Sequence, residues 1–269
     1  MTHYPLLNPE NSQIRVIGKY AHAWDYCTLW GRYTSMRGLL HYTTYQGNFR
    51  SLARWLSKST TLFYLSLFFK TLKTMIYKEN KEQIERVIEN SFKVIQKVYE
   101  VQREGLTYKG DYTGSRIIFP LKSNDEVRIS EQELRFIFIE QLNAEIQNSG
   151  WNVYYSVETP TQDRYIFSDG IKPRVDENGR SANFDLVIYN SAFKRVALIE
   201  FKANNPDKRD YEKDFVKLAN CKETGEIRYF IQVIKNCNKG TIHSLSMKVS
   251  NKDIYRCWSL EGTEITKLI

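Results

Sequence analysis

Apolar residues recur at steps of three and four from about residue 47 to residue 104, as in Leu52, Trp55, Leu62 and Leu65. This period predicts helices that bury one face. Gly105 ends the pattern. Residues 105–129 contain three glycines, a proline and mixed charge, a composition typical of a linker. We therefore predict a mainly helical domain over residues 1–108 and a linker over residues 109–129.

From residue 130 the hydrophobic pattern changes. Ser130 followed by Glu133 has the spacing of a capping box, and Gly150 is a stop signal, so a helix is expected between them. The patterns that follow predict a strand, a hairpin, a helix and two further strands, over residues 151–159, 183–203, 210–219, 227–234 and 254–260. The order α, β, β, β, α, β predicts an α/β domain over residues 130–269, with a mixed sheet and helices on both faces.

Three charged residues interrupt the two apolar strands of the hairpin: Asp185, Glu200 and Lys202. Side chains alternate across a strand, so pairing through a turn near residues 190–194 would bring all three together on one face. Burying unpaired charges costs several kcal/mol, so they need a partner, a metal or a catalytic role. A second ExK triplet starts at Glu79, so the triplet alone means little. The alternative is an exposed Glu–Lys pair beside a turn that holds Asp185.

This grouping suits a divalent metal. Mg²⁺ takes oxygen ligands, which Asp185, Glu200 and the backbone carbonyl of Phe201 could supply, and Mn²⁺ could substitute for it. Such a metal activates a bound water and offsets phosphate charge, while Lys202 orients the water or holds the phosphate. The cysteines and histidines form no cluster with the spacing of a zinc site.

These residues resemble the signature of the PD-(D/E)XK nucleases, the restriction-endonuclease-like superfamily. "FD" at residues 184 and 185 corresponds to the family's "PD", with Phe184 in place of proline, and "EFK" at residues 200–202 corresponds to its triplet. The resemblance covers residues 130–235. It implies a core of αβββαβ type and Mg²⁺-dependent cleavage of phosphodiester bonds.

The resemblance also implies a glutamate on the first core helix that acts in catalysis and metal binding. Glu133 is our choice, with Glu131 and Glu140 as alternatives, and the competing interpretation of Glu133 is the capping box alone. On the following helix, Lys213 and Lys217 lie four residues apart on one face. They could contact phosphate, or they could form a solvated lysine face.

Charge and aromatic residues are concentrated near the N-terminus. Residues 1–78 contain ten lysines and arginines but two acids, an excess of eight, together with 15 of the 37 aromatics. Interleaved basic and aromatic residues suit nucleic-acid binding, with Trp30, Arg32 and Arg37 as candidate contacts. The alternative is a helical domain with an aromatic core and a solvated basic face.

Partners and location follow from what the sequence lacks. The N-terminus has no secretory signal pattern. The most apolar window, residues 62–69, is too short to span a bilayer, so we predict a cytoplasmic protein with no membrane partner. No GxxxxGK[ST] motif is present, so any NTPase or targeting function would come from a partner subunit. Cutting both strands of a duplex would favour a homodimer.

We therefore predict a metal-dependent endonuclease in restriction, defence or DNA processing, acting on DNA in preference to RNA. The alternative is a catalytically inactive nucleic-acid-binding or assembly protein on a nuclease scaffold. In a third interpretation, the helical half recruits a protein partner through its aromatic surface. Salt would separate binding to phosphate, which weakens steeply as salt rises, from an apolar protein interface.

Overall fold

The computed structural model describes residues 59–104, 115–168, 172–204, 208–235, 237–241, 243, 253–261 and 264–268. The chain divides into two compact units, Met1–Thr71 and Leu72–Ile269. The fold below is that of the second unit. Trp30, Arg32 and Arg37, the predicted nucleic-acid contacts near the N-terminus, lie outside the described residues.

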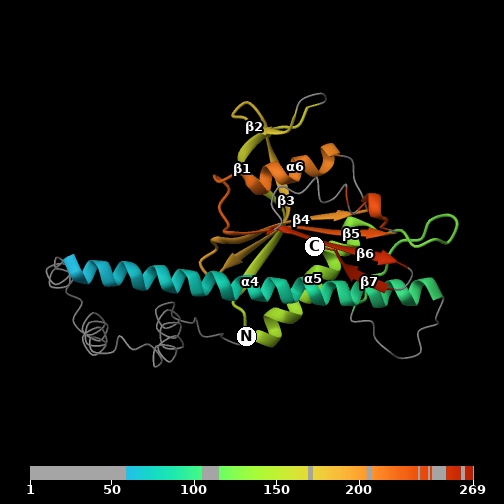
Figure 1. Cartoon of the computed structure of the whole chain (residues 1–269), viewed down its shortest axis with the longest axis horizontal. Coiled ribbons are helices and arrows are strands. Elements are labelled where there is room, and N and C mark those ends of the chain that lie inside the picture. The colour runs from blue at the N-terminus through green and yellow to red at the C-terminus, as the bar shows by residue number, and fades with distance from the viewer. Residues whose placement is uncertain are drawn as a thin grey trace, which may run out of the picture. The chain divides into compact units, whose positions relative to one another are not determined.

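A seven-stranded mixed sheet forms the centre of the second unit, in the order β2-β1-β3-β4-β5-β6-β7 (Figure 1). Neighbouring strands are antiparallel except for β4–β5 and β5–β6, which are parallel. The strands are β1 (Val153–Ile166), β2 (Arg174–Val175), β3 (Arg180–Asn190), β4 (Arg195–Ala203), β5 (Ile227–Lys235), β6 (Tyr255–Glu261) and β7 (Glu264–Lys267). The predicted mixed sheet is confirmed.

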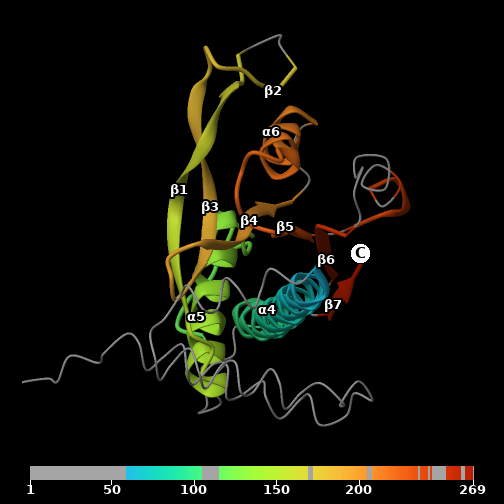
Figure 2. The same cartoon turned by 90° about the vertical axis from the view of Figure 1, so that its left-hand side faces the viewer.

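Helices cover both faces of this sheet, as predicted. The part of α4 (Ser59–Glu104) from Leu72 onward and α5 (Glu131–Ser149) lie on one face, and α6 (Lys208–Ala219) lies on the other (Figure 2). Parallel strands need a crossover connection, and α6 provides it between β4 and β5. The sequence order α5, β1, β3, β4, α6, β5 matches the predicted order, with the short β2 inserted.

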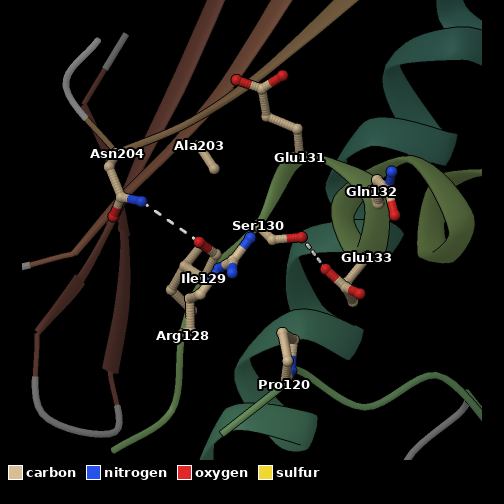
Figure 3. A pocket seen from close by; sticks show the side chains of 9 residues that line it. All are labelled: Pro120, Arg128, Ile129, Ser130, Glu131, Gln132, Glu133, Ala203 and Asn204. Atoms are coloured by element: carbon tan, nitrogen blue, oxygen red, sulfur yellow. Dashed lines mark hydrogen bonds between the residues drawn. The ribbon is translucent and has the colours of Figure 1, made fainter. Parts of the chain in front are cut away.

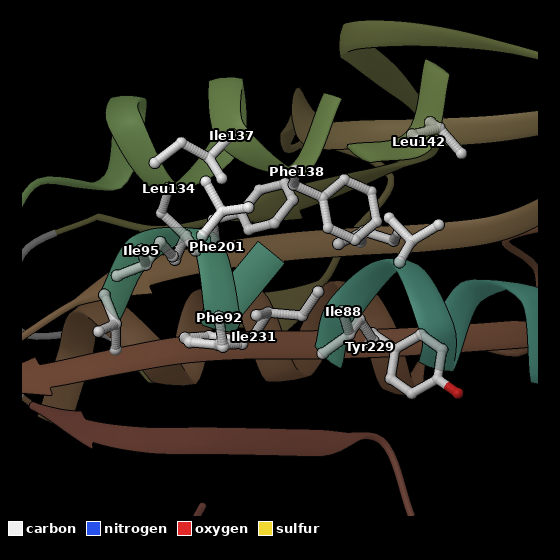
Figure 4. Packing of buried hydrophobic residues seen from close by; sticks show 14 of the residues in the cluster. Ile88, Phe92, Ile95, Leu134, Ile137, Phe138, Leu142, Phe201, Tyr229 and Ile231 are labelled. Atoms are coloured by element: carbon white, nitrogen blue, oxygen red, sulfur yellow. The ribbon is translucent and has the colours of Figure 1, made fainter. Parts of the chain in front are cut away.

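The larger core lies between α4, α5 and the sheet (Figure 4). Phe92 of α4 stacks on Trp258 of β6 with ring centroids 3.8 Å apart, and Phe138 of α5 meets Phe201 of β4 edge to face at 5.2 Å. A smaller core under α6 includes Leu218. Both cores place apolar residues of one helix face against alternate residues of the strands, which is the pattern that the periodicity predicted.

The division between the units differs from the predicted domain boundary. It falls inside α4, between Thr71 and Leu72, and not near residue 108. The predicted linker also contributes to the core, because Phe119 and Ile129 are buried and the backbone of Phe119 exchanges two hydrogen bonds with the Gln102 side chain, at 2.7 and 2.8 Å. Helical periodicity predicts the apolar face of α4 but not the element that packs against it. A segment rich in glycine and polar residues is read as a linker even when single side chains such as Phe119 are buried.

The ends of α5 lie where the sequence predicted them. Ser130 is the N-cap residue with extended backbone, and Gly150 takes the left-handed conformation, φ 66°, at the C-cap. The Ser130 hydroxyl, however, donates to the Glu133 carboxylate and makes no bond to a backbone N–H of the helix. Among the helices that the structure describes, none is long and apolar enough to cross a bilayer.

Candidate active site

The strands β3 and β4 separate where their charged residues begin. Their ladder ends with the pair Leu186 and Ile199, so Asp185 and Glu200 are the next residues in register. The N–H of Phe201 donates to Asp185 Oδ2 at 2.7 Å instead of to a strand carbonyl. Asp185 therefore lies beside the backbone of the EFK triplet, with a side chain taking the place of a ladder bond.

Glu200 points toward α6 and is 1% exposed. The Nζ atom of Lys217, on α6, lies 2.5 Å from Glu200 Oε1 and 2.9 Å from Asp214 Oδ1. Lys217 also donates to the carbonyl oxygen of Asn183 on β3 at 2.7 Å. A buried lysine of α6 therefore joins the glutamate of β4 to an aspartate one helical turn earlier.

Lys202 extends this arrangement toward α5. Its Nζ atom lies 3.1 Å from Asp214 Oδ2 and 3.4 Å from Glu131 Oε2. Carboxylates and ammonium groups therefore alternate from the sheet through α6 to the start of α5. We call this set the carboxylate–lysine cluster, made of Glu131, Asp185, Glu200, Lys202, Asp214 and Lys217.

The cluster has more acids than bases. Four carboxylates against two ammonium groups leave an excess of two negative charges when all six are ionised. Burial raises the pKa of Glu200 well above its usual range, and the charges of Asp214 and Asp185 act in the same direction. Burial and the charge of Asp185 also raise the pKa of Glu131. The cluster therefore disfavours its own full ionisation, and an added cation would relieve this repulsion.

A divalent cation would find oxygen ligands here. Glu200 Oε1 and Asp214 Oδ2 are buried and lie near lysines, yet neither accepts a hydrogen bond of regular geometry. No group of three His, Cys, Asp or Glu side chains in the described part of the chain is arranged to hold a metal. A cation at Asp185 and Glu200 would thus take two carboxylates and complete its shell with the Phe201 carbonyl oxygen and water, which suits Mg²⁺.

The predicted helix acids lie in different surroundings. Glu131 contacts Lys202, whereas Glu133 is bonded to Ser130, and Figure 3 shows these two glutamates pointing in different directions. Glu140 accepts a hydrogen bond from the Arg116 backbone at 3.4 Å. The structure therefore brings Glu131, an alternative in the sequence analysis, to the cluster. It does not bring Glu133 or Glu140 there.

The two lysines predicted on α6 also differ. Lys213 is partly exposed and lies 3.6 Å from Asp210, one turn earlier, whereas Lys217 is buried in the cluster. Asp214 was missed by the sequence analysis. Its signal was available, because Asp214 and Lys217 lie on the same helical face as the buried Tyr211 and Leu218. A charged residue on the apolar face of a helix indicates a candidate site in the same way as a charged residue within an apolar strand.

A cleft of about 630 Å³ opens beside the cluster. It lies between the start of α5 and the end of β4, where the Asn204 side chain donates to the carbonyl oxygen of Ile129 at 3.3 Å (Figure 3). Its lining residues are Pro120, Arg128, Ile129, Ser130, Glu131, Gln132, Glu133, Ala203 and Asn204. Glu131 belongs both to the cleft and to the cluster, so a molecule in the cleft would lie next to the charged groups.

Comparison with known proteins gives no functional assignment. No family model, curated protein or solved structure matches the chain significantly. A mixed sheet with helices on both faces serves many unrelated activities, so the fold class alone does not indicate one. Function is therefore inferred from the chemistry of the cluster.

The two glutamates at the start of α5 can be distinguished by experiment. Glu131→Gln removes a negative partner of Lys202. If the chain is the nuclease that its sequence predicts, we expect this change to lower the rate of phosphodiester cleavage about 10- to 100-fold. Glu133→Gln is the matched control on the same helical turn. It alters the contact with Ser130 and one residue of the cleft lining, but no contact of Lys202, so we expect near-normal cleavage and a loss of at most about 1 kcal/mol in unfolding free energy. Initial cleavage rates and urea unfolding would measure both. A larger rate loss in Glu133→Gln would assign the helix acid to Glu133.

Proposed function

We propose that this protein is a divalent-metal-dependent endonuclease, with DNA favoured over RNA, built on a PD-(D/E)XK core. The observation that carries the proposal is the position of Asp185, Glu200 and Lys202 where β3 and β4 separate, with Asp185 bonded to the backbone of the EFK triplet. The order α5, β1, β3, β4, α6, β5 supports it, because the nuclease family has a core of αβββαβ type.

Each residue of the cluster has a role in this proposal. Asp185, Glu200 and the carbonyl of Phe201 would hold Mg²⁺ or Mn²⁺, which when bound activates water and offsets charge on the scissile phosphate. Lys202 is partly exposed, at 15% of its side chain, so it can reach a substrate phosphate. Glu131 and Asp214 position its ammonium group from two sides.

Lys202 acts as a donor in this scheme. Burial lowers its pKa, but the charges of Asp214 and Glu131 outweigh burial and hold the pKa above its ordinary value. Lys202 therefore stays protonated at neutral pH. It donates hydrogen bonds to a phosphate oxygen or to the attacking water, and it does not serve as the general base.

A restriction, defence or DNA-processing role is part of this proposal and rests on the resemblance. A homodimer follows if both strands of a duplex are cut, and any NTPase activity would come from a partner subunit because the chain has no GxxxxGK[ST] motif. Cytoplasmic localisation likewise stays a prediction. DNA is favoured because the family's members cut it. The net positive charge of residues 1–78 supports binding to the phosphates of either nucleic acid. That segment would supply phosphate contacts that carry no sequence specificity.

One observation favours a second function. The Lys217 ammonium lies 2.5 Å from Glu200 Oε1, so its charge is paired with a carboxylate that a metal would need. If that ion pair is permanent, the protein binds nucleic acid or assembles with a partner without cutting. Only the first function predicts hydrolysis.

The test is a cleavage assay on purified protein. Supercoiled, linear and single-stranded DNA and RNA would be incubated with wild type in Mg²⁺, Mn²⁺ or EDTA. The control for contaminating nuclease is Asp185→Asn, whose amide oxygen can still accept the Phe201 N–H while the negative charge is lost. We expect wild type to cleave in Mg²⁺ or Mn²⁺ but not in EDTA. Binding of DNA with no cleavage in either metal would support the second function.

A further inference from the structure

The Lys217 side chain is a buried cation tied to a candidate metal ligand. Its ammonium lies between Glu200 and Asp214, at 2.5 and 2.9 Å, and only 7% of the side chain is exposed. The carbonyl of Asn183, at 2.7 Å, and the ring of Phe184, with its centroid 5.6 Å from Nζ, fix it beside β3. A lysine so enclosed does not form part of a solvated surface that contacts nucleic acid.

We propose that Lys217 and a divalent cation compete for Glu200, and that Asp214 retains the Lys217 ammonium when the cation binds. This inference rests on the proposed function, because it names the group that sets metal affinity at that site. Lys217 thereby acts as a tethered counter-ion, and it touches neither substrate nor water in the reaction.

The Lys217 ammonium would need to move only a small distance in such an exchange. Lys217 already contacts Asp214 Oδ1, so giving up Glu200 leaves it with a carboxylate partner and with the Asn183 carbonyl. Asp214 is in turn held by Lys202 through its other oxygen, at 3.1 Å. Each charged group would therefore keep at least one opposite charge or hydrogen bond, which avoids the cost of an unpaired buried ion.

The charges of the cluster also give the exchange a direction. With both lysines in place, the cluster has an excess of two negative charges. A divalent cation that binds Glu200 offsets this excess, whereas the Lys217 ammonium alone does not. The lysine lowers metal affinity, because the cation must displace it and is repelled by it at short range. A neutral residue at position 217 would remove both effects.

The experiment measures binding of Mn²⁺ alone to the full-length chain by calorimetry, without substrate. Lys217→Met is expected to bind Mn²⁺ about tenfold more tightly than wild type, because the competing charge is gone. Asp214→Asn is expected to bind it more weakly, about threefold or more, because the displaced ammonium loses its second partner and stays on Glu200. Lys213→Met, four residues away on the same helix, is the matched control and should bind as wild type does.

The opposite signs of the two variants separate this role from a structural one. Loss of packing would weaken binding in both, and urea unfolding of each variant would show whether it is folded. Equal or weaker Mn²⁺ binding by folded Lys217→Met, with binding still abolished in Glu200→Gln, would overturn the counter-ion role and leave the nuclease proposal standing. If Mn²⁺ binding to wild type does not depend on Glu200, both fail. If Lys217→Met does not fold, normal binding by Asp214→Asn would overturn the inference by itself.

Discussion

Glu200→Gln is expected to lower the rate of metal-dependent cleavage about 10³-fold or more, while the protein becomes no less stable. The amide has the shape of the carboxylate but lacks its charge, so it is a poor ligand for Mg²⁺. A bound metal supplies several kcal/mol of transition-state stabilisation, and each 1.4 kcal/mol corresponds to about tenfold in rate. Single-turnover cleavage of labelled DNA at saturating protein would measure the loss.

Although Glu200→Gln should cut more slowly, we expect it to be more stable than wild type at high pH. The pKa of Glu200 is raised in the folded protein, chiefly by burial and then by Asp214 and Asp185. The folded state therefore holds a proton that the unfolded chain releases at lower pH. Its contribution to stability is present at low pH and declines as the pH rises above the ordinary carboxyl value of 4.5. Glutamine removes this decline, because it does not ionise.

Thermal melts in EDTA at pH 5 and pH 8 would measure this difference. We expect Glu200→Gln to melt above wild type at pH 8, and to differ less at pH 5. Lys217 keeps Asp214 as its partner in the variant, so no unpaired lysine offsets the gain. A variant that melts well below wild type at pH 8 would show that the ion pair with Lys217 outweighs the burial of the carboxylate.

Much of the fold could be predicted because local patterns determine it. The ends of α5 follow from Ser130 and Gly150, and the pairing of β3 with β4 follows from a short turn between two apolar runs. The elements that pack against α4 could not be predicted from local patterns. An apolar helical stripe indicates that a partner exists, but the partner of α4 includes Trp258 of β6, far away in sequence.

The site shows the same limit at the level of single residues. Asp185, Glu200 and Lys202 were found because charges stand out within apolar strands. The choice between Glu131 and Glu133 could not be made from sequence, because it depends on which side of the first turn of α5 faces Lys202. Likewise, the spacing of Lys213 and Lys217 placed them on one helical face. It did not show that the sheet covers one of them and leaves the other partly exposed.

The largest loss of stability is expected at Glu223, in the loop between α6 and β5. This residue is 1% exposed and lies 3.2 Å from the Arg195 guanidinium at the start of β4. Its oxygens also accept hydrogen bonds from the hydroxyl of Tyr165 at 2.9 Å and from the backbone N–H groups of Gln162 and Asp163 at 2.9 and 3.0 Å. One carboxylate thus ties the far part of β1 to β4 and to the loop that follows α6.

Glu223→Ala is expected to cost about 3–5 kcal/mol in unfolding free energy, because Arg195 and two backbone N–H groups would lose their partner inside the protein. Glu226→Ala in the same loop is the matched control. Glu226 is half exposed and pairs with the exposed Lys73, so its removal should cost less than about 1 kcal/mol. Urea unfolding followed by tryptophan fluorescence would give both values, and equal costs would contradict the assignment.

Glu223→Ala also tests whether the candidate site depends on this distant anchor. Asp185 lies on β3, which pairs with β1 along most of its length, so the anchor at Glu223 also steadies the strand that carries Asp185. Glu223 itself has no contact with the carboxylate–lysine cluster among the described residues. We therefore expect Glu223→Ala, assayed below its melting temperature, to retain cleavage and to require the same metal. Loss of cleavage in a fully folded Glu223→Ala would mean that the position of Asp185 depends on this distant anchor.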